Sequence, residues 1–145
     1  MGSYNKYIVV IDQGTTSTRS ILYNHKLIPI AIEKIKIKQY FPKQGWSEQD
    51  PEEIWNSVLK TLESIIKKNN IKSNEILSLG ITNQRETSII WNKLTGKAIY
   101  KAIVWEDKRT SDYCKKIKTK KLEKTIQKIT GLTIDPYFSA TKIKW

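Results

Sequence analysis

Residues 7–19 read YIVVIDQGTTSTR and join an apolar run to a short polar turn. The run, from Tyr7 to Ile11, is rich in β-branched residues and has the length of a strand buried on both faces. It ends at Asp12, and a turn with one glycine and several hydroxyl residues follows at once. We therefore expect a central strand that delivers an acid and hydroxyl groups to the edge of a sheet.

The residues after this turn predict two more strands. Residues 18–23 form the second, and residues 27–39 form a third that suits an edge position because it contains a proline. The apolar side chains of the third strand change phase between Ile32 and Ile35. Because neighbouring residues of a strand point to opposite faces, this change predicts a β-bulge or bend near residues 33–34.

A helix is predicted next by its own start signals. Asp50 can accept hydrogen bonds from free N–H groups, Pro51 suits the first helical position, and residues 52–53 are acidic. The helix should end near residues 69–70, and its apolar positions repeat at helical spacing. These positions are Ile54, Trp55, Val58, Leu59, Leu62, Ile65 and Ile66.

The rest of the chain alternates between short apolar runs and helical patterns. Three strands, a helix and a further strand predict an α/β domain, a mixed sheet flanked by helices. Gly131 is a candidate C-cap for the last full helix. The predicted elements are a loop at 44–49, strands at 76–82, 87–91 and 99–105, a turn at 92–96, and helices at 107–117 and 122–129.

Composition indicates a globular protein. Hydrophobic residues make up 39% and charged residues 28% of the 145 residues, enough to bury one core. The single cysteine, Cys114, cannot form an intramolecular disulfide. No apolar run is long enough to cross a membrane and no leader opens the chain, so we expect a cytoplasmic protein without a membrane partner. Met1-Gly2-Ser3 is interpreted as a cloning remnant.

The chain is strongly basic, with a formal net charge of +12 from 26 Lys and Arg against 14 Asp and Glu. The lysines are spread along the sequence, and residues 115–121 form the one true cluster. A polyanion partner would explain such a cluster. A solvated face is the more common meaning of a charge run, so a basic nucleic-acid-binding module is kept only as an alternative.

The turn at residues 12–19, called the phosphate turn below, carries groups that bind phosphate. Gly14 lets a ligand approach the backbone closely, and N–H groups and hydroxyls can cradle phosphate oxygens. Asp12 could hold Mg²⁺, usually through water, and Arg19 could neutralise phosphate charge. The turn is not a Walker P-loop, because no GKS or GKT sequence opens a helix there. A hydroxyl-rich hairpin turn without a ligand is the alternative.

A second polar segment, residues 82–86, lies between two predicted strands. Arg85 offers several N–H donors, whereas the carboxylate of Glu86 only accepts hydrogen bonds. An adjacent donor and acceptor can satisfy neighbouring hydroxyls of a polyol. A surface loop with one ion pair is the alternative.

Two aromatic residues complete the candidate site. Trp105 ends an apolar run, and Tyr137 follows an Asp-Pro pair at residues 135–136. An indole face can pack on the carbons of a substrate while a phenol hydroxyl binds one of its oxygens. Two core aromatics without a ligand would explain the same sequence.

Together these segments resemble the FGGY family of carbohydrate kinases, and within it the glycerol kinases. The phosphate turn alone points to the family in general, whereas ITNQRET, residues 81–87, is much more specific to the glycerol branch. The similar stretches follow the family's order over nearly the whole chain. They are residues 12–19, 42–46, 48–51, 80–87, 95–97, 102–105, 109–110, 130–132 and 135–139.

The resemblance implies an actin-like, ribonuclease H-like ATPase fold with two domains around a cleft. It implies ATP-dependent phosphorylation of glycerol to sn-glycerol 3-phosphate, with Mg²⁺, by a cytoplasmic enzyme that is a dimer or tetramer. A kinase for another polyol or sugar of the family is the alternative. By this resemblance, residues 1–145 would be the N-terminal portion of the first FGGY domain, with the second domain absent and no activity on their own.

The resemblance also implies roles for the residues of the phosphate turn. Asp12 would lie near Mg²⁺, and the other residues would contact the phosphates of ATP or ADP. These other residues are Thr15, Thr16, Ser17 and Arg19. Phosphoryl transfer suits such a turn, because its catalysis consists mostly of positioning and charge neutralisation.

For the substrate, the resemblance implies that Arg85, Glu86 and Tyr137 hydrogen-bond the glycerol hydroxyls while Trp105 packs on the carbons. The catalytic base of the family is an aspartate in its later half, so no catalytic residue is expected within this chain. One departure is residues 106–108, where glycerol kinases usually have Gln directly after the Trp and often Arg two residues later. We expect this departure to alter charge near the glycerol pocket.

Overall fold

The computed structural model describes residues 6–145 of the chain. The predicted cloning remnant, Met1-Gly2-Ser3, lies outside the described residues. The chain divides into two compact units. Unit 1 contains the residues up to Lys38 together with Asp50–Gln84, and unit 2 contains Gln39–Gln49 and Arg85–Trp145.

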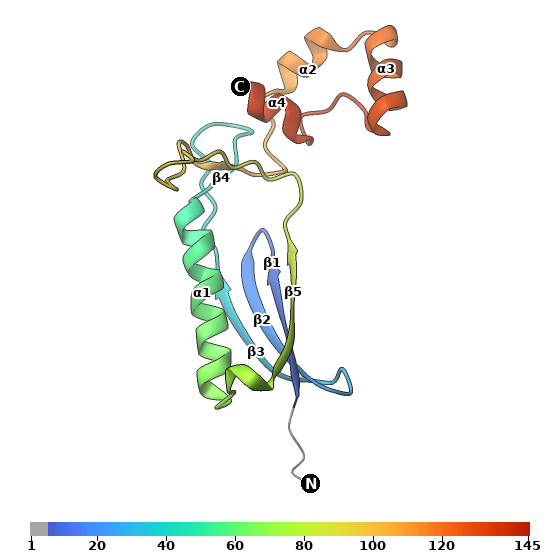
Figure 1. Ribbon diagram of the computed structural model, residues 1–145. Helices are drawn as coiled ribbons and strands as arrows, with labels where there is room; N and C mark the ends of the chain where they lie inside the picture. Colours follow the sequence, from blue (N-terminus) through green and yellow to red (C-terminus); the bar gives the residue numbers. More distant parts are fainter. Residues whose placement is uncertain (1–5) are drawn as a thin grey trace. The chain divides into compact units, whose positions relative to one another are not determined.

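Unit 1 is built on a four-stranded mixed sheet (Figure 1). β1 pairs antiparallel with β2 and parallel with β5, and β2 pairs antiparallel with β3. The strand order is therefore β3-β2-β1-β5, with the predicted central strand inside the sheet. The strands are β1 (Tyr7–Gln13), β2 (Ser17–Asn24), β3 (Pro29–Lys36) and β5 (Ile76–Asn83). The predicted strands at 7–11, 18–23 and 76–82 are confirmed.

β3 shows that the predicted position of the bulge was wrong. Its pairing with β2 is regular through residues 33–34, and the register shifts instead between Leu22 and Tyr23. Ile32 and Ile35 thus lie on opposite faces of a regular edge strand. Because Ile32 is 58% exposed, an apolar residue on the uncovered face, rather than a bulge, accounts for the change of phase.

Helix α1 (Pro51–Lys68) begins as predicted and packs mainly on β2 and β3. Asp50 is its N-cap, and the carboxylate accepts hydrogen bonds from the backbone N–H groups of Glu52 and Glu53 at 2.9 and 3.4 Å. The helix ends at the C-cap Asn69, within the predicted range. A single 3₁₀ turn, η1 (Ser73–Glu75), then leads into β5.

The apolar stripe predicted for α1 is only partly confirmed. Ile65 forms the buried core of unit 1 with Val9 and Leu22. Trp55 and Leu59, which belong to the predicted stripe, are instead 56% and 42% exposed. The helix is rotated so that smaller polar side chains, rather than these two, meet the sheet.

Two hydroxyl pairs explain this rotation. Thr18 Oγ1 lies 2.7 Å from Ser57 Oγ, and Ser20 Oγ donates to Thr61 Oγ1 at 2.9 Å. All four residues are buried, and β2 presents its hydroxyls to the helix at the end that follows the phosphate turn. Since buried hydroxyls need partners, the complementary face of α1 is polar at these positions.

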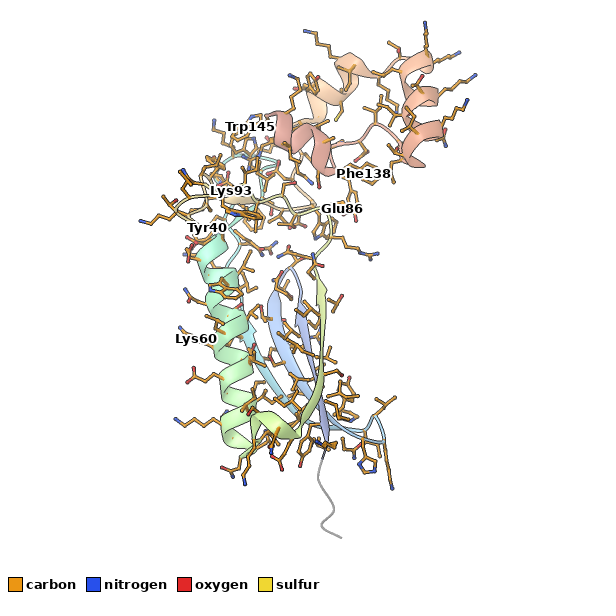
Figure 2. The ribbon with its side chains drawn as sticks, viewed as in Figure 1. Tyr40, Lys60, Glu86, Lys93, Phe138 and Trp145 are labelled. Atoms are coloured by element: carbon orange, nitrogen blue, oxygen red, sulfur yellow. The ribbon has the colours of Figure 1, made fainter. Side chains whose placement is uncertain are left out.

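Replacement of Asp50 by Ala should lower the free energy of unfolding by about 1 kcal/mol, because it removes the acceptor for two N–H groups at the start of α1. Urea unfolding followed by circular dichroism measures this loss. Lys60→Ala, on the exposed side of the same helix (Figure 2), is the matched control, with an expected change below about 0.5 kcal/mol. Equal losses in the two variants would contradict the capping role.

Unit 2 contains a two-stranded sheet and three helices. β4 (Glu48–Gln49) pairs antiparallel with β6 (Ala102–Ile103). The helices are α2 (Ser111–Ile117), α3 (Lys120–Thr130) and α4 (Ser139–Lys144). α3 ends at Gly131 with φ 75°, a left-handed cap that glycine favours, so the predicted cap is confirmed.

The strand predicted at residues 87–91 is wrong. The segment contributes only single bridges, Ser88 to Ile103 and Trp91 to Ala98. The turn predicted at residues 92–96 follows and is confirmed. In it, Gly96 N donates to the carbonyl of residue 92 at 2.8 Å. The two arms of this turn therefore meet at isolated bridges and not in a continuous ladder.

Other predicted boundaries in unit 2 also change. The strand predicted at 99–105 is reduced to β6, and the loop predicted at 44–49 contains β4. α2 begins at Ser111, later than predicted, because the Asp107 side chain accepts a hydrogen bond from Arg109 N and forms a turn before it. Within residues 6–145, no helix is both long and apolar enough to span a membrane.

Candidate functional site

The phosphate turn lies in unit 1, between the end of β1 and the start of β2. The N–H of Gly14 donates to the carbonyl oxygen of Ser17 at 3.0 Å and closes the turn. A Cβ atom on Gly14 would lie 3.3 Å from that oxygen, closer than side chains normally approach. Glycine therefore permits the tight backbone that the sequence predicted here.

Three of the four hydroxyl residues of the turn, Thr15, Thr16 and Ser17, differ in exposure. Thr16 is exposed and Thr15 is half-buried, whereas Ser17 is only 6% exposed. The carbonyl of Thr16 accepts a hydrogen bond from Ile37 N at 3.0 Å, which anchors the turn to the segment after β3. A ligand at this turn would meet the hydroxyls of Thr15 and Thr16 before that of Ser17.

Asp12 and Arg19 face each other across β1 and β2 as register partners. Nη2 of Arg19 lies 2.8 Å from Oδ2 of Asp12, and the two side chains are 47% and 29% exposed. An ion pair this exposed contributes at most about 1 kcal/mol. A phosphate group can therefore compete for Arg19, and a cation for Asp12.

The phosphate turn has only one carboxylate for a metal ion. Among the described residues, no group of three or more His, Cys, Asp or Glu could hold a metal. Mg²⁺ commonly binds through one or two carboxylates plus water and substrate phosphates, so the single carboxylate of Asp12 fits this ion and not a dedicated protein cage.

The predicted polyol residues, Arg85, Glu86, Trp105 and Tyr137, all belong to unit 2. The rings of Trp105 and Tyr137 meet edge to face, with centroids 5.7 Å apart and an interplanar angle of 64°. The backbone N–H of Trp105 donates to Thr87 Oγ1 at 3.3 Å, so the main chain at Trp105 is tied to the segment that contains Glu86. Arg85 directly precedes Glu86 and is exposed.

Glu86 has an unusual backbone. Its φ is 60°, in the left-handed region that residues with a Cβ seldom adopt. Its carbonyl oxygen accepts a hydrogen bond from Lys142 Nζ at 3.0 Å and a longer one from Ser139 Oγ at 3.4 Å. Both donors come from α4 and hold the carbonyl in this conformation.

Lys142 was not among the predicted site residues, yet it links two of the polyol residues, Glu86 and Tyr137. Its Nζ also donates to the carbonyl oxygen of Tyr137 at 2.5 Å. Burial lowers the pKa of Lys142, and the nearby charges of Asp107, Glu86 and Asp135 oppose that effect. No pattern in the sequence signals this role, since a lysine in a short helix is normally solvated.

The acids at residues 106–107 both have partners. Asp107 is 1% exposed and its Oδ2 lies 2.8 Å from Nη2 of Arg109. Oε1 of Glu106 accepts hydrogen bonds from Gln39 Nε2 at 2.7 Å and from Ser47 Oγ at 3.2 Å. The carboxylate of Asp107 is thus paired inside unit 2 with the guanidinium two residues later.

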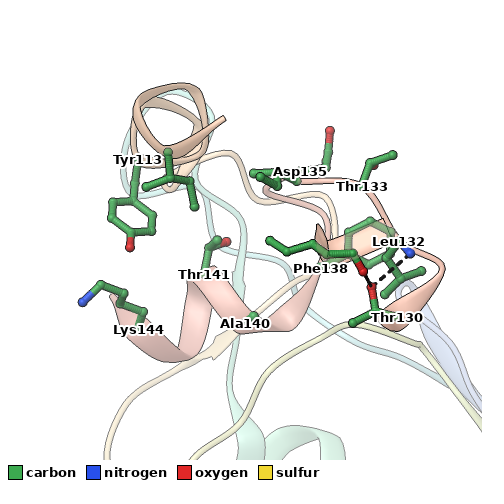
Figure 3. Close-up of a pocket in the computed structure, with 12 residues that line it drawn as sticks. Tyr113, Thr130, Leu132, Thr133, Asp135, Phe138, Ala140, Thr141 and Lys144 are labelled. Carbon is green, nitrogen blue, oxygen red and sulfur yellow. Dashed lines mark hydrogen bonds between the residues drawn. The ribbon is translucent and has the colours of Figure 1, made fainter. Parts of the chain in front are cut away.

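An apolar cavity of about 260 Å³ lies between the helices of unit 2 (Figure 3). Leu132, Ile134 and Phe138 line it, and none of the polyol residues does. The hydroxyl of Thr130 at its edge already donates to Ile126 O and accepts from Leu132 N. This cavity is therefore separate from the candidate polyol site and suits neither phosphate nor a polyol.

Comparison with known proteins places the chain in a family. Residues 7–145 match the model of the N-terminal domain of the FGGY family of carbohydrate kinases. The chain is 53% identical over 139 residues to a glycerol kinase of Sinorhizobium fredii, covering 96% of this chain and 28% of that protein. It is 51% identical over 145 residues to a glycerol kinase of Mycoplasmopsis pulmonis, covering 100% and 29%. The chain thus spans less than a third of the length of these relatives.

Solved structures give the same answer for the fold. The crystal structure of Plasmodium falciparum glycerol kinase with ADP matches with a TM-score of 0.89 at 38% identity, over 97% of this chain and 28% of that chain. A ligand-bound xylulose kinase from Lactobacillus acidophilus matches with a TM-score of 0.87 at 24% identity, which shows the shared fold alone, over 97% and 28%. The predicted actin-like, ribonuclease H-like fold is confirmed. Since the family model matches all but the first six residues, the chain belongs to the FGGY family of carbohydrate kinases.

Proposed function

We propose that this chain supplies the phosphate turn and part of the substrate site of an ATP-dependent glycerol kinase. The reaction transfers the γ-phosphoryl group of ATP to glycerol and yields sn-glycerol 3-phosphate and ADP. One observation carries the proposal: Glu86, Trp105 and Tyr137 are held together in unit 2 of a chain about half identical to named glycerol kinases. Because the chain spans less than a third of those relatives, we assign it part of the site.

The polyol residues have complementary roles in this proposal. Arg85 donates hydrogen bonds to one glycerol hydroxyl, and the carboxylate of Glu86 accepts from its neighbours. Trp105 packs on the carbons, and Tyr137 binds a further oxygen through its phenol hydroxyl. The edge-to-face contact of the two rings fixes the indole plane, which supports a packing role for Trp105.

The phosphate turn binds the nucleotide in this proposal. The hydroxyls of Thr15 and Thr16, the backbone at Ser17 and the guanidinium of Arg19 contact phosphate oxygens. Asp12 holds Mg²⁺ through water, and the ion would supply neutralisation of phosphate charge. The exposed ion pair of Asp12 with Arg19 supports these roles, since both side chains reach the same surface of the sheet.

A chimera tests the proposal. Residues 7–145 replace the similar segment of the Mycoplasmopsis pulmonis glycerol kinase, and ADP formation is followed with glycerol, erythritol and xylulose. We expect turnover that depends on glycerol and exceeds that with the other two substrates. Faster turnover with erythritol or xylulose would favour the alternative, a kinase for another polyol or sugar. A second chimera built on the Sinorhizobium fredii relative provides an independent host.

Nothing in the comparisons favours the other alternative, a basic nucleic-acid-binding module, since the relatives are kinases. Salt-sensitive binding of duplex DNA by the chain would revive it, because neutralised phosphates release counterions. Absence of binding at low salt would remove it.

Arg19→Ala should raise the KM for ATP in the chimera about tenfold, which corresponds to the loss of one charge-assisted hydrogen bond of about 1.4 kcal/mol. The KM for glycerol should stay unchanged. Lys34→Ala is the matched control, since Lys34 is the exposed basic residue directly opposite Arg19 on β3. An equal rise in the KM for ATP with both variants would show a general effect of surface charge instead of a contact by Arg19.

A further inference from the structure

Lys142 is the one buried lysine among the described residues. Its side chain belongs to α4 and the residue is 3% exposed. Lysine is almost never buried without a reason, because its ammonium loses hydration. The burial of Lys142 on a short helix therefore calls for specific partners of its ammonium group.

The ammonium group of Lys142 binds two backbone carbonyls. Nζ donates to the oxygen of Tyr137 at 2.5 Å and to the oxygen of Glu86 at 3.0 Å. These residues are 51 positions apart in the sequence (137 − 86 = 51), and both are polyol residues. Figure 2 labels Glu86 close to Phe138, the residue that follows Tyr137.

The conformation of Glu86 depends on such a partner. A residue with a Cβ in the left-handed region costs about 1–2 kcal/mol, and such strain persists only where the surroundings hold it. The φ of Glu86 is 60°, and the carbonyl that this conformation presents is the one that Lys142 binds. Without the ammonium group, the backbone at Glu86 would lose its principal partner on α4.

We infer that Lys142 is a positioning residue of the glycerol site. It joins the backbone of Glu86 to that of Tyr137 and so fixes the positions of the two side chains that bind the substrate. The inference rests on the proposed function. Lys142 touches neither glycerol nor ATP in this role, and it acts only through the two carbonyls.

Because the proposed role of Lys142 depends on its charge, the KM for glycerol should depend on pH. Burial lowers the pKa of the ammonium, while Asp107, Glu86 and Asp135 oppose the shift, and the ring of Tyr137 lies 6.0 Å from Nζ. The proton is thus lost at a lower pH than from an exposed lysine. Above that pH the two hydrogen bonds weaken, so the KM for glycerol should rise on the alkaline side. In Lys142→Arg this rise should be absent, because a guanidinium stays charged.

Kinetics in the chimera test the role directly. Lys142→Met keeps the length of the side chain without its donors, and we expect at least a tenfold rise in the KM for glycerol with less than a twofold change in the KM for ATP. Lys142→Arg should bring the KM for glycerol most of the way back to the value of the parent. Lys144→Met, two residues further on the same helix and exposed, is the matched control and should behave like the parent. A KM for glycerol unchanged in Lys142→Met would overturn the inference.

A second measurement does not depend on catalysis. In the 145-residue chain, the amide signals of Thr87 and Phe138, which follow the two bound carbonyls, should titrate together at alkaline pH and should not do so in Lys142→Arg. If the two amide signals titrate together but the parent chimera does not turn over glycerol, the link between the carbonyls is supported and the proposed function is rejected. If the chimera turns over glycerol but the two signals do not titrate together, the proposed function is supported and the role of Lys142 is rejected.

Discussion

Glu86→Ala in the chimera should lower kcat/KM for glycerol by at least about 100-fold. In the proposed site the carboxylate accepts hydrogen bonds from substrate hydroxyls, and bonds to a charged group contribute about 1.5–3 kcal/mol each. A 100-fold loss corresponds to about 2.7 kcal/mol of transition-state stabilisation. Steady-state kinetics with glycerol and ATP varied separately measure it, and the KM for ATP should change little. A kcat/KM within threefold of the parent would contradict the assignment of Glu86.

The left-handed backbone of Glu86 allows a sharper version of this test. Glycine adopts such a φ without steric cost, so Glu86→Gly should raise the melting temperature and still lose activity. Leu27→Gly, at an exposed residue with the same φ of 60° in unit 1, is the matched control. It should stabilise the chain and leave the kinetics unchanged. Stability and activity lost together in Glu86→Gly would mean that the variant disturbs the fold rather than the carboxylate.

Local signals predicted the part of the fold that positions the phosphate turn. The β-branched run up to Ile11 predicted the central strand, because β-branched residues favour strands. Its burial on both faces was not borne out, since Val9 is buried whereas Ile8 and Val10 are only half-buried. The start of α1 was predictable from Asp50 and Pro51, since capping depends only on neighbouring residues. Gly14 and the hydroxyls beside it marked the turn for the same reason. Their assignment to a nucleotide remains a prediction.

Properties that depend on distant residues could not be predicted. The α1 face that meets the sheet is set by the hydroxyls of Thr18 and Ser20 on β2, so hydrophobicity alone put Trp55 on the wrong side. The left-handed φ of Glu86 has no local cause, because its carbonyl is held from α4. Lys142 was missed for the same reason: its partners lie on two separate segments, and only the tertiary structure brings them together.

The interior of unit 2 is organised around a buried arginine that the sequence analysis used only as a family match. Nη2 of Arg109 lies 2.8 Å from a carboxylate oxygen of Glu48 and 2.8 Å from one of Asp107, and its side chain is fully buried. The guanidinium carbon also lies over the rings of Trp46 and Trp145, 3.8 and 4.7 Å from their centroids. The acids and the rings therefore share one cation.

The guanidinium of Arg109 stays protonated in its buried position. Burial alone would lower the pKa of Arg109, but hydrogen bonds to Asp107 and Glu48 outweigh burial and raise the pKa above its ordinary value. A buried lysine that loses its partner can release a proton, whereas an arginine stays charged. Removal of Asp107 would thus leave the guanidinium with Glu48 as its one carboxylate partner, and Ser47 N and Arg109 N and Nε would lose their acceptor inside unit 2.

Asp107→Ala should consequently lower the free energy of unfolding of unit 2 by about 3–5 kcal/mol, the usual cost of breaking a buried ion pair from one side. Urea unfolding in a Trp55→Phe background measures it, since the other four tryptophans all lie in unit 2. Asp112→Ala is the matched control: Asp112 also pairs with a basic residue, Lys115 at 3.3 Å, but is 96% exposed, so no measurable change is expected. The loss in the free energy of unfolding for Asp107→Asn should lie between those for Asp107→Ala and Asp112→Ala, because the amide keeps an acceptor for the guanidinium but not the charge. A loss in Asp107→Ala no larger than in Asp112→Ala would mean that Glu48 and the indole rings suffice to hold the cation.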